Sequence, residues 1–184
     1  MRIKIFVLLC LTAIMQFTGV TPLKASHYYY KQLSLKDGVT SAVRCILTDK
    51  QGFVWIGTKA GISRYDGHEL KKYVYSPNNP HSIPNNLIHQ IAEDEMSNIW
   101  ILTDKGIARY QRQSDDFFLP TDEKGNPIIA YSTCLTKDGV LFGSKDKVYF
   151  YSYRDSSLRL LQKLNKGNNF NISLLSLWNE HTVL

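Results

Sequence analysis

The chain has 184 residues, a formal net charge of +6 at pH 7, and 43% hydrophobic and 21% charged residues. Without its first 25 residues the net charge is about +3, which is ordinary for a soluble surface. The basic residues form no helix or stripe, so the sequence does not predict contact with nucleic acid.

The first 25 residues are predicted to be an export signal and not part of the fold. Arg2 and Lys4 form a basic start, Ile5 to Phe17 is apolar, and Ala25 is a small residue before a cleavage site. The apolar stretch is short for a membrane span. Cleavage after Ala25 is therefore expected, and an uncleaved N-terminal anchor is the alternative.

One pattern occurs twice, without a gap, at a spacing of 45 residues. The first copy runs from Val43 to Tyr65 and the second from Ile88 to Tyr110. A period in the low forties with strand-like content is typical of β-propeller blades. The identical pairs include Asp49 and Asp94, Trp55 and Trp100, Thr58 and Thr103, Gly61 and Gly106, Ile62 and Ile107, Arg64 and Arg109, and Tyr65 and Tyr110.

Each copy is predicted to form four short antiparallel strands. Alternation predicts a first strand with Val43, Cys45 and Leu47 on one side, and Gly52 lies in the hairpin turn that follows. The next strands of the first copy are expected at residues 53–58, 62–65 and 70–75, and those of the second at 88–93, 99–103, 107–110 and 117–119.

Two more copies are less regular. Leu141 stands at the tryptophan position of a third copy, and residues 171–184 resemble the start of a fourth, with Leu184 at that position. The expected fold is all-β, with about three and a half four-stranded propeller blades after the signal. Residues 26–184 hold blades near 33–75, 83–119 and 128–164 and a partial blade at 168–184. Because such a set cannot close a ring, the sequence is expected to be the front piece of a longer protein or a truncated product.

The two tryptophans are interpreted as structural. One four-stranded sheet buries its faces poorly, so blades become stable by stacking on their neighbours. Trp55 and Trp100 lie mid-blade, where a large flat ring can fill the wedge between adjacent sheets. A role in binding a ligand is much less expected for either ring.

The sequence predicts no catalytic, cofactor-binding or metal-binding residue, and it assigns no ligand-binding residue. The acidic pairs Glu93-Asp94 and Asp115-Asp116 fall at turns or strand ends, where carboxylates bond turns or face water. Cys45 and Cys134 are interpreted as small buried hydrophobes and not as a disulfide framework. The histidines show no metal-ligand spacing: His27, His68, His81, His89 and His181.

Three short segments leave alternatives open. The connector Ser76 to Asn86 is interpreted as a solvated linker, or as a binding loop at the rim. Tyr28-Tyr29-Tyr30 is interpreted as a strand that starts the first blade or closes the ring, or as a contact for sugars. The glycosylation triplet Asn171-Ile172-Ser173 is too short to carry weight.

The segment Val43 to Gly67, preceded by Leu33 to Val39, resembles the two-component-regulator propeller repeat. Ile83 to Ile88 resembles the same lead-in element in the second blade. The resemblance covers residues 33–110 strongly and 128–184 weakly. An export signal followed at once by such repeats is similar to the periplasmic sensor halves of Bacteroides-type hybrid two-component systems.

This resemblance implies a larger protein with two seven-bladed propellers, an immunoglobulin-like domain, a membrane span, a histidine kinase, a receiver and a DNA-binding domain. It implies a periplasmic location with an inner-membrane anchor, a homodimer, and an oligosaccharide ligand. The partners of this segment would be the remaining blades and the downstream sensor-kinase domains, without a cofactor. No kinase motif surrounds any of the five histidines, so this segment is not expected to be an enzyme. The alternatives are a secreted propeller enzyme acting on polysaccharide and a non-catalytic interaction scaffold.

Overall fold

A computed structural model describes residues 32, 42–163, 177–179 and 182–183, and every element in them is a β-strand. The chain divides into residues 1–32 and 33–184, and the features below belong to the second unit. Among the residues described, none forms a helix long and apolar enough to cross a bilayer. The predicted signal, Tyr28-Tyr29-Tyr30, the glycosylation triplet, His27, His181 and Leu184 lie outside the described residues.

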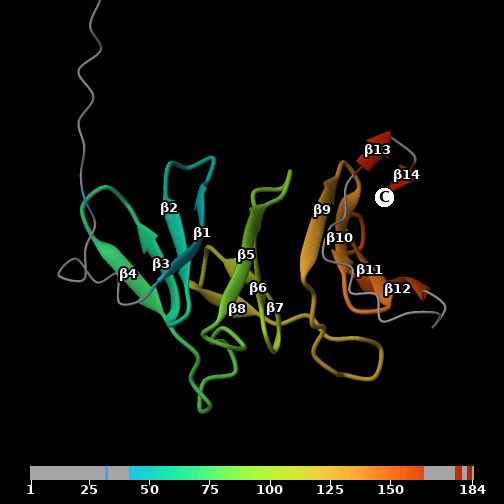
Figure 1. Cartoon of the computed structure of the whole chain (residues 1–184), viewed down its shortest axis with the longest axis horizontal. Coiled ribbons are helices and arrows are strands. Elements are labelled where there is room, and N and C mark those ends of the chain that lie inside the picture. Colours follow the sequence, from blue (N-terminus) through green and yellow to red (C-terminus); the bar gives the residue numbers. More distant parts are fainter. Residues whose placement is uncertain (1–31, 33–41, 164–176, 180–181, 184) are drawn as a thin grey trace, which may run out of the picture. The chain divides into compact units, whose positions relative to one another are not determined.

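The predicted blades form three four-stranded antiparallel sheets (Figure 1). Blade 1 consists of β1 (Val43–Thr48), β2 (Val54–Thr58), β3 (Gly61–Tyr65) and β4 (Leu70–Tyr73). Blade 2 consists of β5 (Ile88–Glu93), β6 (Ile99–Thr103), β7 (Gly106–Gln111) and β8 (Asp116–Phe118). Blade 3 consists of β9 (Ser132–Thr136), β10 (Gly139–Gly143), β11 (Lys147–Ser152) and β12 (Leu158–Lys163).

Within each sheet, strands that follow one another in sequence are hydrogen-bonded neighbours. A further hairpin, β13 (Leu177–Asn179) with β14 (Thr182–Val183), lies where the partial fourth copy is predicted. Strand β4 ends two residues earlier than predicted. The reason is that the Tyr75 N–H donates to the Asn86 side chain at 2.7 Å, so the chain has already left the sheet there.

The ladders confirm the alignment of the repeats. In blade 1, Trp55 lies between Leu47 and Arg64 of the flanking strands. Trp100 has the same place in blade 2, between Ala92 and Arg109. In blade 3 that place belongs to Leu141, between Cys134 and Phe150. The third copy therefore keeps the register of the first two although it lacks the tryptophan.

The simple alternation predicted for the first strand is wrong at its start. The register of β1 shifts between Val43 and Cys45, and β5 has the same irregularity between Ile88 and Gln90. Such a bulge inserts a residue and turns the preceding side chain away from its expected face. Val43 is consequently exposed, whereas Cys45 is half-buried as predicted.

The hydrophobic core lies between the sheets. One cluster joins blades 1 and 2 and includes Trp55, Tyr73, Ile91, Ile101 and Tyr110. A second cluster joins blades 2 and 3 and includes Trp100, Leu102, Ile107, Phe142 and Tyr151. Each blade is thus stabilised by its neighbour, as expected for stacked repeats.

The connector between blades 1 and 2 is anchored to the fold and is not simply a solvated linker. Ser82 Oγ accepts a hydrogen bond from the Ser76 N–H at 3.0 Å and donates one to the Asn79 carbonyl at 2.9 Å. The Phe117 N–H donates to the His81 carbonyl at 3.0 Å, and Ile83 is fully buried. Only residues 77–81 are exposed throughout, so any rim-loop contact would be limited to that tip.

Candidate functional site: the interfaces between blades

The repeated aspartate and tryptophan form one structural unit. Trp55 Nε1 donates to Asp49 Oδ2 at 3.0 Å. Asp49 Oδ1 accepts from the backbone N–H groups of Gln51 at 3.0 Å and Phe53 at 2.9 Å. One buried carboxylate therefore both shapes the hairpin turn and satisfies the indole N–H. Burial raises the pKa of Asp49, but these hydrogen bonds and Arg112 lower it further, below its ordinary value.

Blade 2 repeats this unit, and blade 3 lacks both of its members. Trp100 Nε1 donates to Asp94 Oδ2 at 2.8 Å. In blade 3 the indole is replaced by Leu141 and the turn is held by Thr136, whose Oγ1 donates to the Gly139 carbonyl at 2.9 Å. Losing donor and acceptor together leaves no buried polar atom unsatisfied, which explains how blade 3 tolerates the departure.

Both tryptophan rings fill the space between blades, as the sequence predicts. Each is fully buried. The Trp55 ring meets Tyr110 of blade 2 edge-on at 4.8 Å between centroids. The Trp100 ring meets Phe142 and Tyr151 of blade 3 in the same way, at 5.1 and 4.8 Å. Neither ring offers surface to a ligand, and edge contacts of this kind add to the gain from burial.

The repeated arginine and tyrosine link successive blades with polar contacts. Arg64 of blade 1 donates to the Tyr110 hydroxyl of blade 2, and Arg109 of blade 2 donates to the Tyr151 hydroxyl of blade 3. Each guanidinium also lies over aromatic rings, such as that of Phe53, 4.8 Å from the Arg64 Cζ. The signature residues of one blade thus hold the next one in place.

Blade 3 exchanges the partners of the cation–aromatic pair. In blade 2 the Arg109 Cζ of β7 lies 5.2 Å from the ring of Phe118 on β8. In blade 3 the ring is on the inner strand, as Phe150, and the cation is on the outer strand, as Arg159, 5.6 Å away. The contact therefore survives although the repeat signature has lost its arginine.

Asp115, in the turn between β7 and β8, accepts hydrogen bonds from both blades. Its carboxylate bonds Lys71, Tyr73 at 2.6 Å, and Tyr110, and it lies 3.3 Å from an Arg64 nitrogen. Burial raises the pKa of Asp115, but the Lys71, Tyr110 and Tyr73 hydrogen bonds outweigh it and set the pKa at about 2. Burial and then the bond to Asp115 raise the pKa of the Tyr73 hydroxyl above its ordinary range.

The low pKa of Asp115 predicts an acid-sensitive interface. The carboxyl titrates at about 2 in the folded chain and near 3.8 when unfolded, so its stabilising effect is complete above about pH 4. It is lost as the pH falls from about 4 to about 2, and solvent screening limits it to about 1–2 kcal/mol. Urea unfolding at several pH values should therefore show a steeper acid loss for the natural chain than for Asp115→Asn. Equal slopes would contradict the role given to Asp115.

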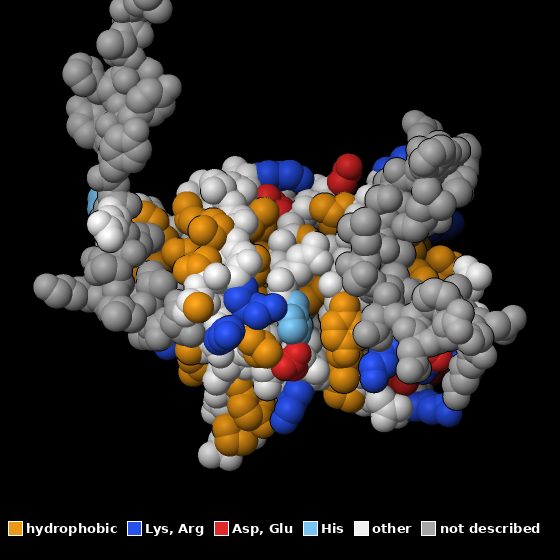
Figure 2. Space-filling model, viewed as in Figure 1, with side chains coloured by type: hydrophobic (Ala, Val, Ile, Leu, Met, Phe, Trp, Pro, Cys, Tyr) orange, Lys and Arg blue, Asp and Glu red, His pale blue; other side chains and the backbone are white. Residues whose placement is uncertain are grey.

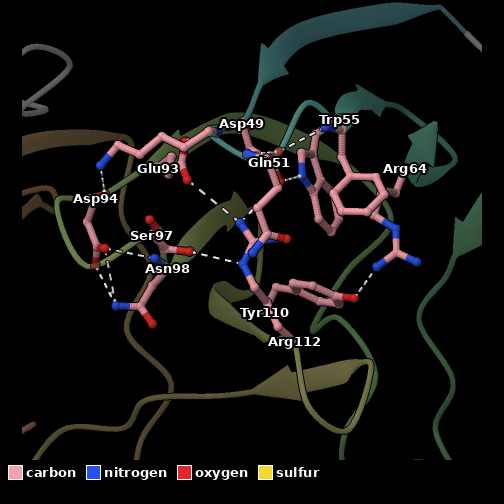
Figure 3. A network of polar contacts seen from close by, with 12 residues as sticks. Asp49, Gln51, Trp55, Arg64, Glu93, Asp94, Ser97, Asn98, Tyr110 and Arg112 are labelled. Atoms are coloured by element: carbon pink, nitrogen blue, oxygen red, sulfur yellow. Dashed lines mark hydrogen bonds and ion pairs between the residues drawn. The ribbon is translucent and has the colours of Figure 1, made fainter. Parts of the chain in front are cut away.

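Arg112 closes the interface from the other side (Figure 3). Its guanidinium donates to Asp49 Oδ2 at 3.1 Å, to Gln51 Oε1 at 2.8 Å and to the Ser97 carbonyl at 3.3 Å. It thereby connects the turn of blade 1 to the turn of blade 2. The Lys50 N–H extends this network to Glu93, 2.8 Å away. Because these residues come from blades 1 and 2, the network fixes the position of one blade relative to the other.

Tyr153 has the corresponding place one blade further on. It follows Tyr151 by two residues, as Arg112 follows Tyr110. Burial and then the charge of Asp94 raise the pKa of its hydroxyl above the ordinary range, which puts this ring beside the blade 2 turn. The position is therefore a contact to the preceding blade in both copies, with a different side chain in each.

The described histidines lie near carboxylates or aromatic rings. In the part of the chain that is described, no three His, Cys, Asp or Glu side chains are placed to hold a metal ion. His81 lies 3.8 Å from Asp116, and His89, at the β5 bulge, pairs with Asp104 and has the Tyr131 ring 6.2 Å away. The sequence did not predict this His–Asp pair, because His89 lies on β5 and Asp104 lies in the turn between β6 and β7, and the repeat pattern does not show that these two places are close.

Other sequence-predicted residues have structural contacts. Asp94 bonds its turn as predicted, through the Asn98 N–H at 2.8 Å. The side chain of Glu93 lies at the blade interface and is only 7% exposed, and one of its oxygens lies 3.7 Å from Arg112. The Cys45 and Cys134 thiols are not joined to each other in a disulfide, and they are half-buried and buried, in agreement with their interpretation as small hydrophobes. On the face that Figure 2 shows, basic side chains form small scattered groups and no continuous stripe.

Comparison with known proteins places the repeat. The family described as two component regulator propeller matches residues 37–60. Histidine kinase P4 of Formosa agariphila is 37% identical over 59 residues, which are 32% of this chain and 4% of that protein. The extracellular domains of two hybrid two-component systems from B. thetaiotaomicron superpose with TM-scores of 0.60 and 0.59, at 19% and 23% identity.

These alignments cover 78% and 82% of this chain but only 20% and 19% of the two solved chains. The chain thus spans a small part of the length of the proteins that it matches. The matched residues include β1 and β2 and contain the Asp49–Trp55 unit. Residues 37–60 are therefore similar to a two-component regulator propeller repeat, and the described strands have the fold of propeller blades.

Proposed function

We propose that the chain is part of a periplasmic sensor that binds an oligosaccharide and transmits the signal within a hybrid two-component regulator. The observation that carries this proposal is the propeller repeat at residues 37–60, set in blades with the fold of extracellular sensor domains. The residues that define the repeat, such as Trp55 and Arg64, make contacts between blades. Their role in this proposal is to couple the blades, and ligand contacts come from other residues.

Coupling between blades supports the transmitting part of the proposal. Arg64, Arg109 and Arg112 each connect two blades, and the aromatic contacts follow the same path. A blade displaced by a ligand would therefore disturb its neighbour's contacts, because packed interfaces do not deform continuously. The segment itself is proposed to be non-catalytic, and a kinase would belong to other parts of the regulator.

A propeller enzyme acting on polysaccharide is the second candidate. The observation that favours it is the His89–Asp104 pair with the Tyr131 ring beside it, since such groups can transfer protons. A scaffold that binds only proteins is a third possibility, because the propeller fold does not determine function.

Calorimetry and turnover assays against one panel of oligosaccharides separate the three functions. The sensor predicts saturable binding of at least one sugar and no cleavage after long incubation. Cleavage that His89→Gln abolishes would instead support the enzyme. The absence of saturable binding across the panel would contradict the sensor and favour the scaffold.

A further inference from the structure

A groove opens beside the outer strands of blade 3, and two of its lining residues, Tyr149 and Leu158, also belong to the core cluster that joins blades 2 and 3. Its volume is about 330 Å³. One wall is the turn at Asp122, in the connector between β8 and β9. The other wall is formed by β11 and β12, from Lys147 to Lys163. A volume of this size is at the lower end of the range for small-molecule sites and suits one or two sugar rings.

Two lysines of the groove face each other across the sheet. Lys147 of β11 and Lys163 of β12 are direct cross-strand partners. Like charges in directly opposite positions destabilise a sheet. Lys124, on the connector, adds a third positive charge to the groove. Within the described residues no carboxylate forms an ion pair with any of these three lysines.

The acidic residues of the groove offset part of this charge. Asp122 accepts hydrogen bonds from the backbone N–H groups of Asn126 at 2.8 Å and Lys124 at 2.9 Å, and from the Asn126 side chain at 3.2 Å. These bonds, led by the Asn126 N–H, lower the pKa of Asp122 and hold its carboxylate in its own turn. Glu123 is the one other carboxylate of the groove. The groove therefore holds three ammonium groups and two carboxylates, and one of these carboxylates, that of Asp122, is bonded within its own turn.

The groove also offers apolar surface. Leu158 and Leu160 of β12 line it together with Tyr149 of β11, which is itself only 7% exposed. Leu160 is 46% exposed, and Leu158 is half-buried. A sugar ring has an apolar face that can lie on such side chains while its substituents meet polar groups.

We propose that this groove binds an acidic sugar of one or two rings, with a hexuronate carboxylate between Lys147 and Lys163. The carboxylate supplies the negative charge that the cross-strand lysine pair lacks, and Leu158 and Leu160 contact the ring. This inference rests on the proposed oligosaccharide-sensing function and names the sugar class that it recognises.

Calorimetry with digalacturonate and with a neutral disaccharide tests the groove. Digalacturonate should bind saturably, and Lys147→Gln together with Lys163→Gln should weaken binding at least tenfold. Lys145→Gln is the matched control, because Lys145 is an exposed lysine of the same blade that does not line the groove. It should leave the affinity unchanged.

The outcomes separate the groove from the sensing function. If a neutral disaccharide binds and digalacturonate does not, the groove proposal is overturned while sugar sensing stands. Equal digalacturonate binding by the natural chain and the double variant would also overturn the groove. If no sugar binds, both proposals fail.

A readout without ligand checks the charge argument independently. Lys147→Gln removes one of two opposed charges, so it should raise the thermal midpoint at low salt. The gain should vanish as added salt screens the repulsion in the natural chain. A lower midpoint at every salt concentration would show that the lysine pair is not repulsive and would remove the electrostatic basis of the proposal.

Discussion

Replacing Trp100 with alanine is expected to lower the free energy of unfolding by about 3–5 kcal/mol, the range for deleting a fully buried aromatic side chain. The indole fills the interface of blades 2 and 3 against Phe142 and Tyr151, and its removal leaves a cavity there. It also removes the hydrogen bond that the buried Asp94 carboxylate accepts. Urea unfolding followed by circular dichroism measures the loss.

Trp100→Phe is the matched control for this prediction. It keeps an aromatic ring in the wedge but leaves Asp94 Oδ2 without the indole donor, so it should cost less than the alanine variant. The loss of one hydrogen bond to a buried carboxylate is about 1–3 kcal/mol. Asp94→Asn should lose little further stability when combined with Trp100→Phe. Full additivity of the two changes would contradict the description of Asp94 and Trp100 as one unit.

Gly57→Ala is also expected to destabilise the interface between blades 1 and 2. A Cβ on Gly57 would lie 2.5 Å from Cys45 Sγ of its own blade and 2.7 Å from Ile88 Cγ2 of the next. These distances are well inside van der Waals contact, so the inner strands of the two blades must move apart. Overpacking of this kind costs about 1–3 kcal/mol. Thermal and urea unfolding of the variant measure that cost.

A second substitution tests the cause of the Gly57 effect. Cys45→Ala removes the sulfur that the new Cβ would meet first, so the double variant should recover part of the stability lost by Gly57→Ala. A coupling of about 0.5–3 kcal/mol is expected between residues in such contact. If the double variant loses as much as the two single changes added together, the close approach at Gly57 is not the reason for the loss.

The repeat predicted the architecture because blades use period-2 strands and the same turn chemistry in each copy. Asp49, Trp55 and Tyr65 recur at fixed positions in each regular copy. These positions agree with the register in which β1, β2 and β3 pair. Leu141 could be aligned without its tryptophan because Gly143, Val148 and Tyr151 follow it at the spacing at which Gly57, Ile62 and Tyr65 follow Trp55. The periodicity therefore predicted blade 3 correctly although its core residue differs.

The polar contacts of the interface could not be predicted from the repeat. Arg112 corresponds to Tyr153 in the next blade, so comparing copies shows no common residue. Asp115 lies in a turn without a counterpart in the repeat pattern, and its partners come from another blade. The bulge in β1 could not be predicted either, since alternation alone does not show where an extra residue is inserted.

The groove in blade 3 depends on a segment that the repeat does not describe. The connector at Asp122 resembles a loop in sequence, yet it forms a turn like those at Asp49 and Asp94. The pairing of Lys147 with Lys163 follows from the register of β11 and β12, which shifts between Val148 and Tyr149. A sequence shows two lysines sixteen positions apart, and only the ladder shows that they face each other.

Hydrogen exchange of the natural chain and of Trp100→Ala tests most directly whether the repeat residues couple neighbouring blades. If Trp100 stabilises the interface, the variant should lose amide protection in β6 and also in β10 and β11 of the next blade. The strands of blade 1 should lose less, because the core around Trp55 stays intact. A loss confined to blade 2, with β10 and β11 as protected as before, would contradict the claim that these residues join the blades.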